Sequence, residues 1–315
     1  MSRPSDHPPI VLDVMGGDRA PQVTVAGAAR AVADGIDVLL CGPQDDLGLR
    51  PLLVAHGFDG AVLPSSGPVG MAEDPAMALR ARPDASVRVG ARAVAAGTAS
   101  ALVSAGPTGA TVAAALLEIG RIPGVRRPVV GARIPVAGGG HAVLVDAGGV
   151  PDPTPDLMVT SARLGMAYAQ ALQDQPGRIP RVGLLNVGAE PGKGNALARS
   201  AYDLLGALDR FVGNVEPAAV LAGDVDVVVT DGFTGNVFLK TLEAMAASRR
   251  PGSGPGDSDA AALLLGVRGT VLIAHGAADA DEIAAALRLA DHLVRADLVG
   301  RLVGSPPADD LGNAE

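Results

Sequence analysis

The chain alternates short, continuous apolar runs with longer alanine-rich stretches of helical periodicity. Runs of Val, Leu, Ile and Ala without alternating polar positions are typical of strands covered on both faces, as in a parallel sheet. Most of these runs end in a glycine-bearing turn that leads into a helical pattern. The predicted strands span 10–14, 36–41, 101–104, 142–146, 182–187, 225–230 and 270–274.

Helical patterns fill the stretches between these runs. Repeated strand, turn and helix units form a twisted, mostly parallel sheet wrapped by helices, so we expect an α/β fold of three layers with helices on both faces. Ligands of such sheets bind at the carboxyl ends of the strands, where the glycine-rich turns lie. The predicted helices span 23–33, 86–96, 108–118, 156–172, 195–208, 235–247 and 281–293.

The remaining stretches lack periodicity. Residues 249–259 read RRPGSGPGDSD, which is typical of a flexible linker or surface loop. Residues 1–9 and 301–315 are predicted to be flexible tails. The length of 315 residues allows one large or two small domains, and we expect a single α/β domain over 10–300 that contains the linker.

Composition and charge exclude several classes of function. The single cysteine, Cys41, rules out intrachain disulfides, and the spacing of the histidines predicts no tight metal site. Only six aromatic residues and a net charge of -9 argue against a nucleic-acid partner. No apolar run approaches the ~18 residues of a membrane span, and the start MSRPSDHPP lacks a signal-peptide core. We therefore predict a cytoplasmic protein.

The first candidate site is LDVMGGDRAP, residues 12–21, where Asp13 ends a predicted strand and Gly16, Gly17 and Asp18 form the turn. Paired glycines let the backbone approach a ligand closely. The alternative is a tight turn in which Asp18 caps the following helix.

The second candidate, VSAGPTGA at 103–110, places Ser104, Gly106, Thr108 and Gly109 where a strand passes into a helix. Amides at a helix start, with two hydroxyls beside them, can bind an anion. A plain strand-to-helix turn is the alternative. The segment is neither a P-loop nor a Rossmann fingerprint, because the following Lys and the glycine spacing are both absent.

The third candidate, VGLLNVGAEPGKGN at 182–195, carries Asn186, Gly188, Glu190 and Lys193 on a glycine-rich loop. The chain has 25 lysines and arginines, of which only Lys193 and Lys240 are lysines. A lysine retained where arginine is the usual cation suggests a need for a compact point charge. The alternative is a solvated surface lysine.

Two further segments complete the candidate site. In 211–244 the residues are Asn214, then Asp231, Thr234 and Asn236 in the turn after a buried strand, with helix capping by Asp231 as the alternative. In 264–279, His275 follows a strand and suits a general acid or base, although a lone histidine is more often simply hydrogen-bonded.

Taken together, these segments resemble a known family. LDVMGGDRAP, SAGPTGA, VGLLNVGAEPGKG, GNVE, VTDGFTGNVFLKTLE and LLGVRG…AHG occur in the order found in the bacterial PlsX-type phosphate acyltransferases. The resemblance implies transfer of a fatty acyl group from acyl carrier protein to inorganic phosphate, giving acyl phosphate for phospholipid synthesis. It also implies a homodimer with a fold like the isocitrate and isopropylmalate dehydrogenases, no cofactor, and at most peripheral contact with the inner face of the membrane. A membrane glycerol-3-phosphate acyltransferase that uses acyl phosphate is the implied partner.

This chemistry requires no covalent enzyme intermediate, because phosphate is a competent nucleophile and a thioester is already activated. The protein must hold an anion beside the carbonyl and stabilise the oxyanion. We predict Lys193, Asn236, Asp231 and His275 as catalytic. The predicted substrate-binding residues are Asp13, Gly16, Gly17, Asp18, Ser104, Gly106, Thr108, Gly109, Asn186, Gly188, Glu190, Asn214 and Thr234.

The chain departs from the family pattern at several positions. Pro107 replaces the usual Asn, residues 81–86 lack the family's lysines, and 249–259 replaces a helical segment. These changes leave three alternatives open: a catalytically weakened homologue that acts as a carrier-protein-binding or regulatory module, a transferase acting on short acyl-CoA, and a nucleotide-dependent dehydrogenase. The last ranks low, since no GxGxxG follows a strand.

Overall fold

The computed structural model describes residues 7–44, 48–173, 177–249 and 261–304. The chain folds into two compact units, each of which packs mainly within itself. Unit 1 comprises Met1–Gly120 and Ser253–Ala296, and unit 2 comprises Arg121–Gly252 and Asp297–Glu315. The range 10–300, predicted from the sequence as one domain, includes residues of both units, and that domain assignment stays a prediction.

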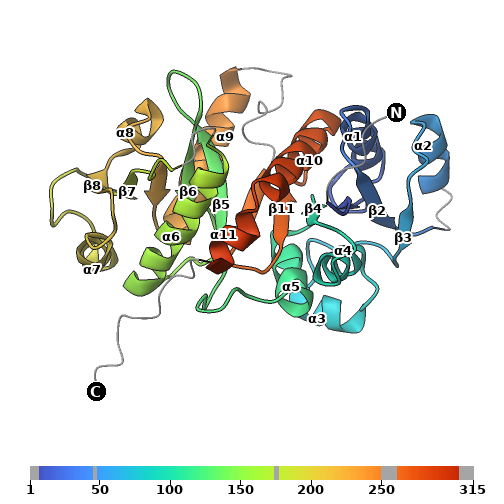
Figure 1. The fold of residues 1–315 in the computed structure, drawn as a ribbon, viewed down its shortest axis with the longest axis horizontal. Coiled ribbons are helices and arrows are strands. Elements are labelled where there is room, and N and C mark those ends of the chain that lie inside the picture. The colour runs from blue at the N-terminus through green and yellow to red at the C-terminus, as the bar shows by residue number, and fades with distance from the viewer. Residues whose placement is uncertain (1–6, 45–47, 174–176, 250–260, 305–315) are drawn as a thin grey trace. The chain divides into compact units, whose positions relative to one another are not determined.

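In unit 1 the described strands lie in the spatial order β3, β2, β1, β4, β11 and β10. Figure 1 labels β3, β2, β4 and β11 of this series. Neighbouring strands are parallel, except that β10 and β11 are antiparallel. The carboxyl ends of β1, β4 and β11 therefore meet at one edge. The strands are β1 (Ile10–Asp13), β2 (Val38–Gly42), β3 (Val62–Pro64), β4 (Ala101–Ser104), β10 (Ala261–Leu265) and β11 (Thr270–Ala274).

Helices cover both faces of these strands. In Figure 1, α1 (Gln22–Ala33) and α10 (Ala280–Arg295) lie on one side, and α4 (Ser86–Ala95) and α5 (Thr108–Glu118) lie on the other. A Cβ atom on Gly27 of α1 would lie 2.6 Å from the Cβ of Ile283 on α10, so glycine is required for this close approach. The shorter helices are α2 (Leu49–Ala55) and α3 (Pro75–Ala81).

In unit 2 the described strands lie in the order β5, β6, β9, β7 and β8. The β5–β6 pair is antiparallel, and the other neighbours are parallel. The strands are β5 (Val129–Pro135), β6 (His141–Val145), β7 (Val182–Leu185), β8 (Phe211–Val215) and β9 (Val227–Val229). The helices are α6 (Pro155–Ala171), α7 (Ala196–Leu205), α8 (Pro217–Ala222), α9 (Gly232–Arg249) and α11 (Leu298–Gly304).

Both cores are built from the apolar runs that predicted the strands. Every residue of β1, β4, β9 and β11 is buried. This complete burial is the reason that these strands carry no alternating polar positions. On the helix side, Gly165 of α6 lets that helix approach Val145 and Val227, because a Cβ atom there would lie within 3 Å of both side chains.

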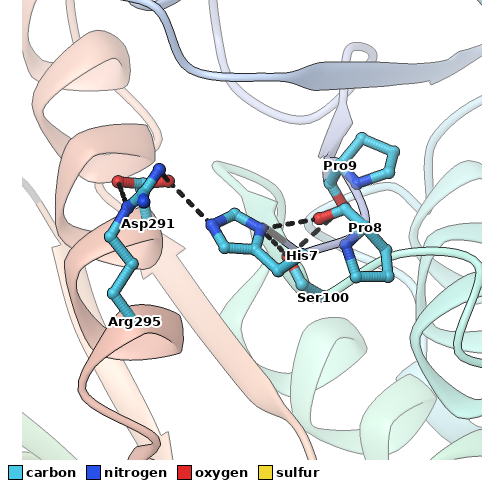
Figure 2. Close-up of polar contacts among 6 residues, drawn as sticks. All are labelled: His7, Pro8, Pro9, Ser100, Asp291 and Arg295. Atoms are coloured by element: carbon cyan, nitrogen blue, oxygen red, sulfur yellow. Dashed lines mark hydrogen bonds and ion pairs between the residues drawn. The ribbon is translucent and has the colours of Figure 1, made fainter. Parts of the chain in front are cut away.

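The amino-terminal end of the described chain is fixed to unit 1 (Figure 2). The His7 imidazole Nε2 lies 3.0 Å from Asp291 Oδ1 on α10, and Arg295 donates to the same carboxylate. His7 Nδ1 lies 3.4 Å from the Ser100 hydroxyl, which precedes β4. Residues 7–9, which the sequence assigned to a flexible tail, therefore contact two elements of the unit.

Two other segments differ from expectation. Residues 301–304 form the end of α11, although the sequence placed them in the C-terminal tail, and Arg249 is the last residue of α9. The rest of the predicted linker and tails, 1–6, 250–259 and 305–315, lies outside the described residues. Among the helices that the structure describes, none combines the length and apolar character needed to cross a bilayer.

Candidate active site

The predicted site residues form two clusters, one in each unit. In unit 1 the centre is Asp13, which is 2% exposed at the end of β1. The Ser104 hydroxyl, at the end of β4, donates to Asp13 Oδ2 at 2.8 Å and accepts from the Gly106 amide at 3.1 Å. This chain of hydrogen bonds ties the loop after β4 to the end of β1.

The two loops are also packed closely. A Cβ atom on Gly16 would lie 2.7 Å from the Gly106 nitrogen and 3.0 Å from Asp13 Oδ2. Only glycine at position 16 allows this approach, and Gly17 has a φ of 110° that disfavours other residues. A pocket of about 190 Å³ opens here and is lined in part by Asp13, Gly16, Gly17, Asp18, Ser104 and Gly106.

Thr108 and Gly109 are exposed in the first turn of α5. The N-cap residue of this helix is Pro107, which makes no side-chain cap, and no acceptor for the Thr108 and Gly109 amides is found among the described residues. Free amides at a helix start favour an anion. The anion cradle predicted from the sequence stays a prediction.

His275 follows β11 and is exposed. The Ala277 amide donates to its Nδ1 at 3.1 Å, so the neutral imidazole carries its proton on Nε2 and can donate it from there. The Asp18 amide donates to the Gly276 carbonyl at 2.8 Å, which places Asp18 beside the residue that follows His275. Asp18 does not cap α1, whose N-cap residue is Pro21 and has no side-chain cap.

The electrostatics of this cluster are dominated by the buried carboxylate. Burial raises the pKa of Asp13 above its ordinary value, against hydrogen bonds from Ser104 and the amides of Met15 and Gly16 that act in the opposite direction. The ionised form of Asp13 therefore lowers the stability of the folded state.

In unit 2, a network of amide side chains shapes the loop after β7. Asn186 donates from Nδ2 to Asn214 Oδ1 at 3.0 Å and to the Lys193 carbonyl at 3.1 Å. Asn214, which is 6% exposed, donates to the Glu190 carbonyl at 2.9 Å. These hydrogen bonds fix the backbone of the loop, while the side chains of Lys193 and Glu190 are exposed. A Cβ atom on Gly188 would lie 2.9 Å from Glu190 Oε2.

A bulge in β8 accompanies the placement of Asn214. Val182 is opposite Phe211, but Leu184 is opposite Asn214, so β8 has one more residue than β7 over this stretch. Gly213 has a φ of 94°, a conformation that favours glycine. Bulges commonly change the direction of a side chain near a site. Here the residue after Gly213 is Asn214, which hydrogen-bonds with Asn186.

The loop after β9 brings Asp231, Thr234 and Asn236 together. The Asp231 carboxylate accepts from the Thr234 amide at 2.8 Å and from its hydroxyl at 2.7 Å, so it caps α9. Asn236 donates from Nδ2 to the Ala147 carbonyl at 3.1 Å, in the loop after β6. The capping alternative for Asp231 is therefore realised, and its proposed catalytic role stays a prediction.

Asp146 is a buried polar residue of this cluster that the sequence analysis did not select. It is 2% exposed and accepts from the amides of Val130, Gly148, Gly149 and Val150. Burial raises its pKa despite these four hydrogen bonds. A signal was present in the sequence, because Asp146 precedes two glycines at the end of a strand, as Asp13 does.

An apolar groove of about 530 Å³ adjoins the polar residues of unit 2. Phe233 and Val237 of α9 line it and are 68% and 51% exposed. Asn186, Asp231 and Thr234 are among the polar residues that also line it. The sequence analysis missed this groove, because its lining comes from several elements far apart in the chain, including Met158, Leu184, Leu185, Leu197 and Phe238.

The chain is similar to known proteins in sequence and in fold. The family described as fatty acid synthesis protein matches residues 9–250. A phosphate acyltransferase from Thermus thermophilus is 43% identical, covering 93% of this chain and 97% of its own. Among solved structures, a phosphotransacetylase from Streptococcus pyogenes has a TM-score of 0.66 at 19% identity, covering 94% of this chain and 95% of its own. A 4-hydroxythreonine-4-phosphate dehydrogenase from Klebsiella pneumoniae has a TM-score of 0.57 at 14% identity, covering 91% and 99%.

The structural similarities confirm the predicted α/β fold class, with a mostly parallel arrangement of strands and helices around it. The second similar structure is a dehydrogenase, in agreement with the dehydrogenase-like fold that the family resemblance implied. At these identities the likeness concerns the fold alone.

Proposed function

The chain belongs to the phosphate acyltransferases of the fatty acid synthesis protein family, and we propose that its acyl donor is a fatty acyl-[acyl carrier protein]. As a member of that family, it is an enzyme that transfers an acyl group to phosphate. The acyl phosphate product is proposed to serve phospholipid synthesis.

The observation that carries the fatty acyl assignment is the groove of about 530 Å³ in unit 2. Its wall is mostly apolar and includes the polar side chains of Asn186, Asp231 and Thr234. Binding sites for small molecules combine apolar walls with a few polar groups in this way. An acyl chain would lie along the apolar side chains of the groove, and its thioester would lie beside these polar groups. A short acyl group would leave much of the groove unfilled.

The proposed chemistry uses the strand-end residues. The phosphate would be held by amides and by the Lys193 ammonium, which is exposed on its loop. Asn236 would donate to the developing oxyanion. In unit 1, His275 with its Nε2 proton is the candidate general acid or base. Asp231 would keep the first turn of α9 in place through Thr234.

We further propose the assembly and location implied by the family resemblance. The protein would be a cytoplasmic homodimer, with at most peripheral contact with the inner face of the membrane. A membrane glycerol-3-phosphate acyltransferase would consume the product. These proposals are separate from the chemistry and are tested separately.

The decisive experiment is to incubate the pure protein with inorganic phosphate and one of two donors, palmitoyl-[acyl carrier protein] or acetyl-CoA. Palmitoyl phosphate should form from the first donor, with little acetyl phosphate from the second. Preferred acetyl transfer would support the short-chain alternative. Binding of the carrier protein without product from either donor would support the catalytically weakened homologue.

A further inference from the structure

An arginine-rich pocket in unit 2 is not used by the groups proposed above for acyl transfer. Its volume is about 270 Å³, and it lies where the loop before β5 and the loop after β6 meet the first half of α6. Three arginines line it, together with two threonines and two aspartates: Arg126, Arg127, Arg163, Thr154, Thr160, Asp152 and Asp156.

The positive charge of this pocket is local, because the whole chain has a net charge of -9. The side chains of Arg126 and Arg127 are exposed, and neither forms an ion pair with any residue that the structure describes. A guanidinium group offers a planar pair of donors that matches phosphate oxygens. Adjacent arginines with no carboxylate partner therefore suit the anionic group of a ligand.

The two aspartates narrow the class of ligand. Asp152 and Asp156 are exposed in the same pocket, and their charges oppose the binding of a small bare anion such as inorganic phosphate. They favour a ligand that carries hydrogen-bond donors next to its anionic group. A phosphopantetheine arm has this composition, since its phosphodiester is followed by a hydroxyl and two amide N–H groups.

The backbone connects the pocket to the proposed reaction centre. Val150 lines the pocket, and its carbonyl accepts from the Gly232 amide at 2.9 Å, at the start of α9. On α6, Leu157 and Val159 line the pocket, whereas Met158 lines the apolar groove. A thioester at the turn before α9 would therefore have the groove on one side and the arginine pocket on the other.

We infer that the arginine pocket binds the phosphodiester of the phosphopantetheine arm of the acyl donor. This inference rests on the proposed function, because it assigns the second half of the same substrate. Arg126 and Arg127 contact the phosphodiester oxygens, and Asp152 and Asp156 accept from the donors of the arm. The acyl chain lies in the groove.

The test compares palmitoyl-pantetheine with palmitoyl-phosphopantetheine, which differ only in the phosphate, at saturating inorganic phosphate. The wild type should have a lower KM for the phosphorylated donor. The double variant Arg126→Gln/Arg127→Gln should raise that KM about tenfold, as expected for loss of charge-assisted hydrogen bonds. Its KM for palmitoyl-pantetheine should not change. Palmitoyl-CoA and palmitoyl-[acyl carrier protein], which share the arm, should both be affected.

Arg210→Gln is the matched control, because it removes the same charge from an exposed residue at the amino end of β8, the end opposite the strand carboxyl ends. It should leave every KM unchanged, and all variants should keep the wild-type Tm.

Three results would overturn the inference. The first is equal use of both pantetheine donors by the wild type. The second is a double variant that raises the KM for inorganic phosphate instead, which would assign the pocket to the phosphate substrate. The third is an effect with the carrier protein alone, which would place the arginines against the protein and not its arm. Absence of transfer from every donor would instead reject the proposed function itself.

Discussion

Lys193 is the exposed cation of the loop after β7. Removal of its charge should therefore change ligand binding without changing the stability of the fold. Its backbone carbonyl is held by Asn186, but its side chain has no packing role in the core. Lys193→Ala should raise the KM for phosphate about tenfold to a hundredfold, since a hydrogen bond to a charged group contributes roughly 1.5 to 3 kcal/mol. Steady-state kinetics with varied phosphate, beside a melting curve, measures both effects.

Lys240 provides the control for this prediction, because it is the other lysine of the chain and is exposed on α9. Lys240→Ala should have a much smaller effect. Lys193→Arg should be only partly tolerated, because a planar fork does not replace a point charge. An unchanged phosphate dependence in Lys193→Ala, at an unchanged Tm, would exclude Lys193 from phosphate binding.

Asp13 has the opposite character, since it is buried and its charge destabilises the fold. Burial raises the pKa of Asp13, so the folded protein favours the protonated carboxyl. The stability that this protonation supplies is fully present below the usual carboxyl pKa of about 3.9. It is lost as the pH rises through the raised pKa of the folded state. Asp13→Asn removes the charge and can keep the bond from the Met15 amide through Oδ1. Its Nδ2 can donate to the Ser104 hydroxyl, which reverses the present direction of that hydrogen bond. The variant should therefore have a higher Tm than the wild type at pH 8, and the difference should shrink toward pH 4.

Asp18→Asn makes the same chemical change at the exposed neighbour and should leave the Tm nearly unchanged. A lower Tm for Asp13→Asn at pH 8 would show that the ionised carboxylate stabilises this cluster. Asp146 should behave differently from Asp13, because its Oδ2 accepts from the Val150 amide and an Asn side-chain NH2 placed there would face another donor.

The candidate residues could be found from the sequence because polar residues and glycines at strand ends are a local pattern. Asp13, Ser104 and Asn214 were all selected in this way, and each makes hydrogen bonds within its cluster. What the local pattern could not supply was the partner of each residue. Asp231 illustrates this limit, since both its capping and its proposed catalytic role fit the same five residues of sequence.

At the scale of elements, the junction of α9 with the loop after β6 depends on Gly235. A Cβ atom at this position would lie 2.0 Å from the Asp146 carbonyl oxygen. Gly235→Ala should therefore displace the first turn of α9, at a cost of about 1 to 3 kcal/mol as for other overpacked sites. Because Asn236 follows directly, activity should fall with stability. Chemical denaturation measures the free energy of unfolding.

Gly304→Ala is the matched substitution, since Gly304 ends α11 and an added Cβ atom would meet nothing within 4 Å. It should be neutral or slightly stabilising, because alanine is the better helix former by about 0.5 to 1 kcal/mol. Equal stabilities for the two variants would show that the α9 junction can move without cost.

The groove beside α9 predicts control of acyl chain length. Val237 is 51% exposed and lines the groove, so Val237→Trp should fill part of its volume. The ratio of kcat/KM for palmitoyl over octanoyl donors should fall, while the octanoyl value changes little. Val212→Trp is a suitable control, because Val212 is 50% exposed on β8 and does not line the groove. An unchanged ratio in Val237→Trp would remove the acyl chain from this groove.

Most of the buried strands and the long helices could be predicted from the sequence, whereas the short helices could not. The buried strands such as β1 and β9 and the long helix α6 follow from their apolar patterns. The helices α2, α3, α8 and α11 have six or seven residues, which is less than two turns and too short to show a period.

The strands that were missed have particular causes. β8 contains Gly213 and Asn214, which are depleted in strands, and the bulge at this point explains their presence. β10 reads AALLL, a short apolar run that fits a helix as well as a strand. β5 and β10 are also the strands that form antiparallel pairs with β6 and β11, which the pattern of parallel units does not predict.

At the scale of the whole molecule, the division into two units could not be predicted from composition. Unit 1 combines Met1–Gly120 with Ser253–Ala296, so its two parts are separated by most of unit 2 in the sequence. Both units contain fully buried strands made mostly of Val, Leu, Ile and Ala, such as β1 in unit 1 and β9 in unit 2. Local patterns identify a strand but do not show which distant strand pairs with it. For example, β4 pairs with β11, which is more than half of the chain away in the sequence.

The oligomeric state is a property of the whole molecule. It can be tested by placing a charge on an exposed apolar residue, because that residue is a candidate for the interface. The family resemblance implies a homodimer, and the far half of α9 leaves Met245 46% exposed. Burial of such side chains stabilises an interface by about 25 cal/mol per Å². We expect light scattering at micromolar concentration to give twice the chain mass of 31.3 kDa.

Met245→Glu tests whether this half of α9 lies in the interface, and it should shift the protein toward monomer. Met77→Glu, at a residue of α3 that is 71% exposed, is the control. A wild-type mass of one chain would reject the dimer.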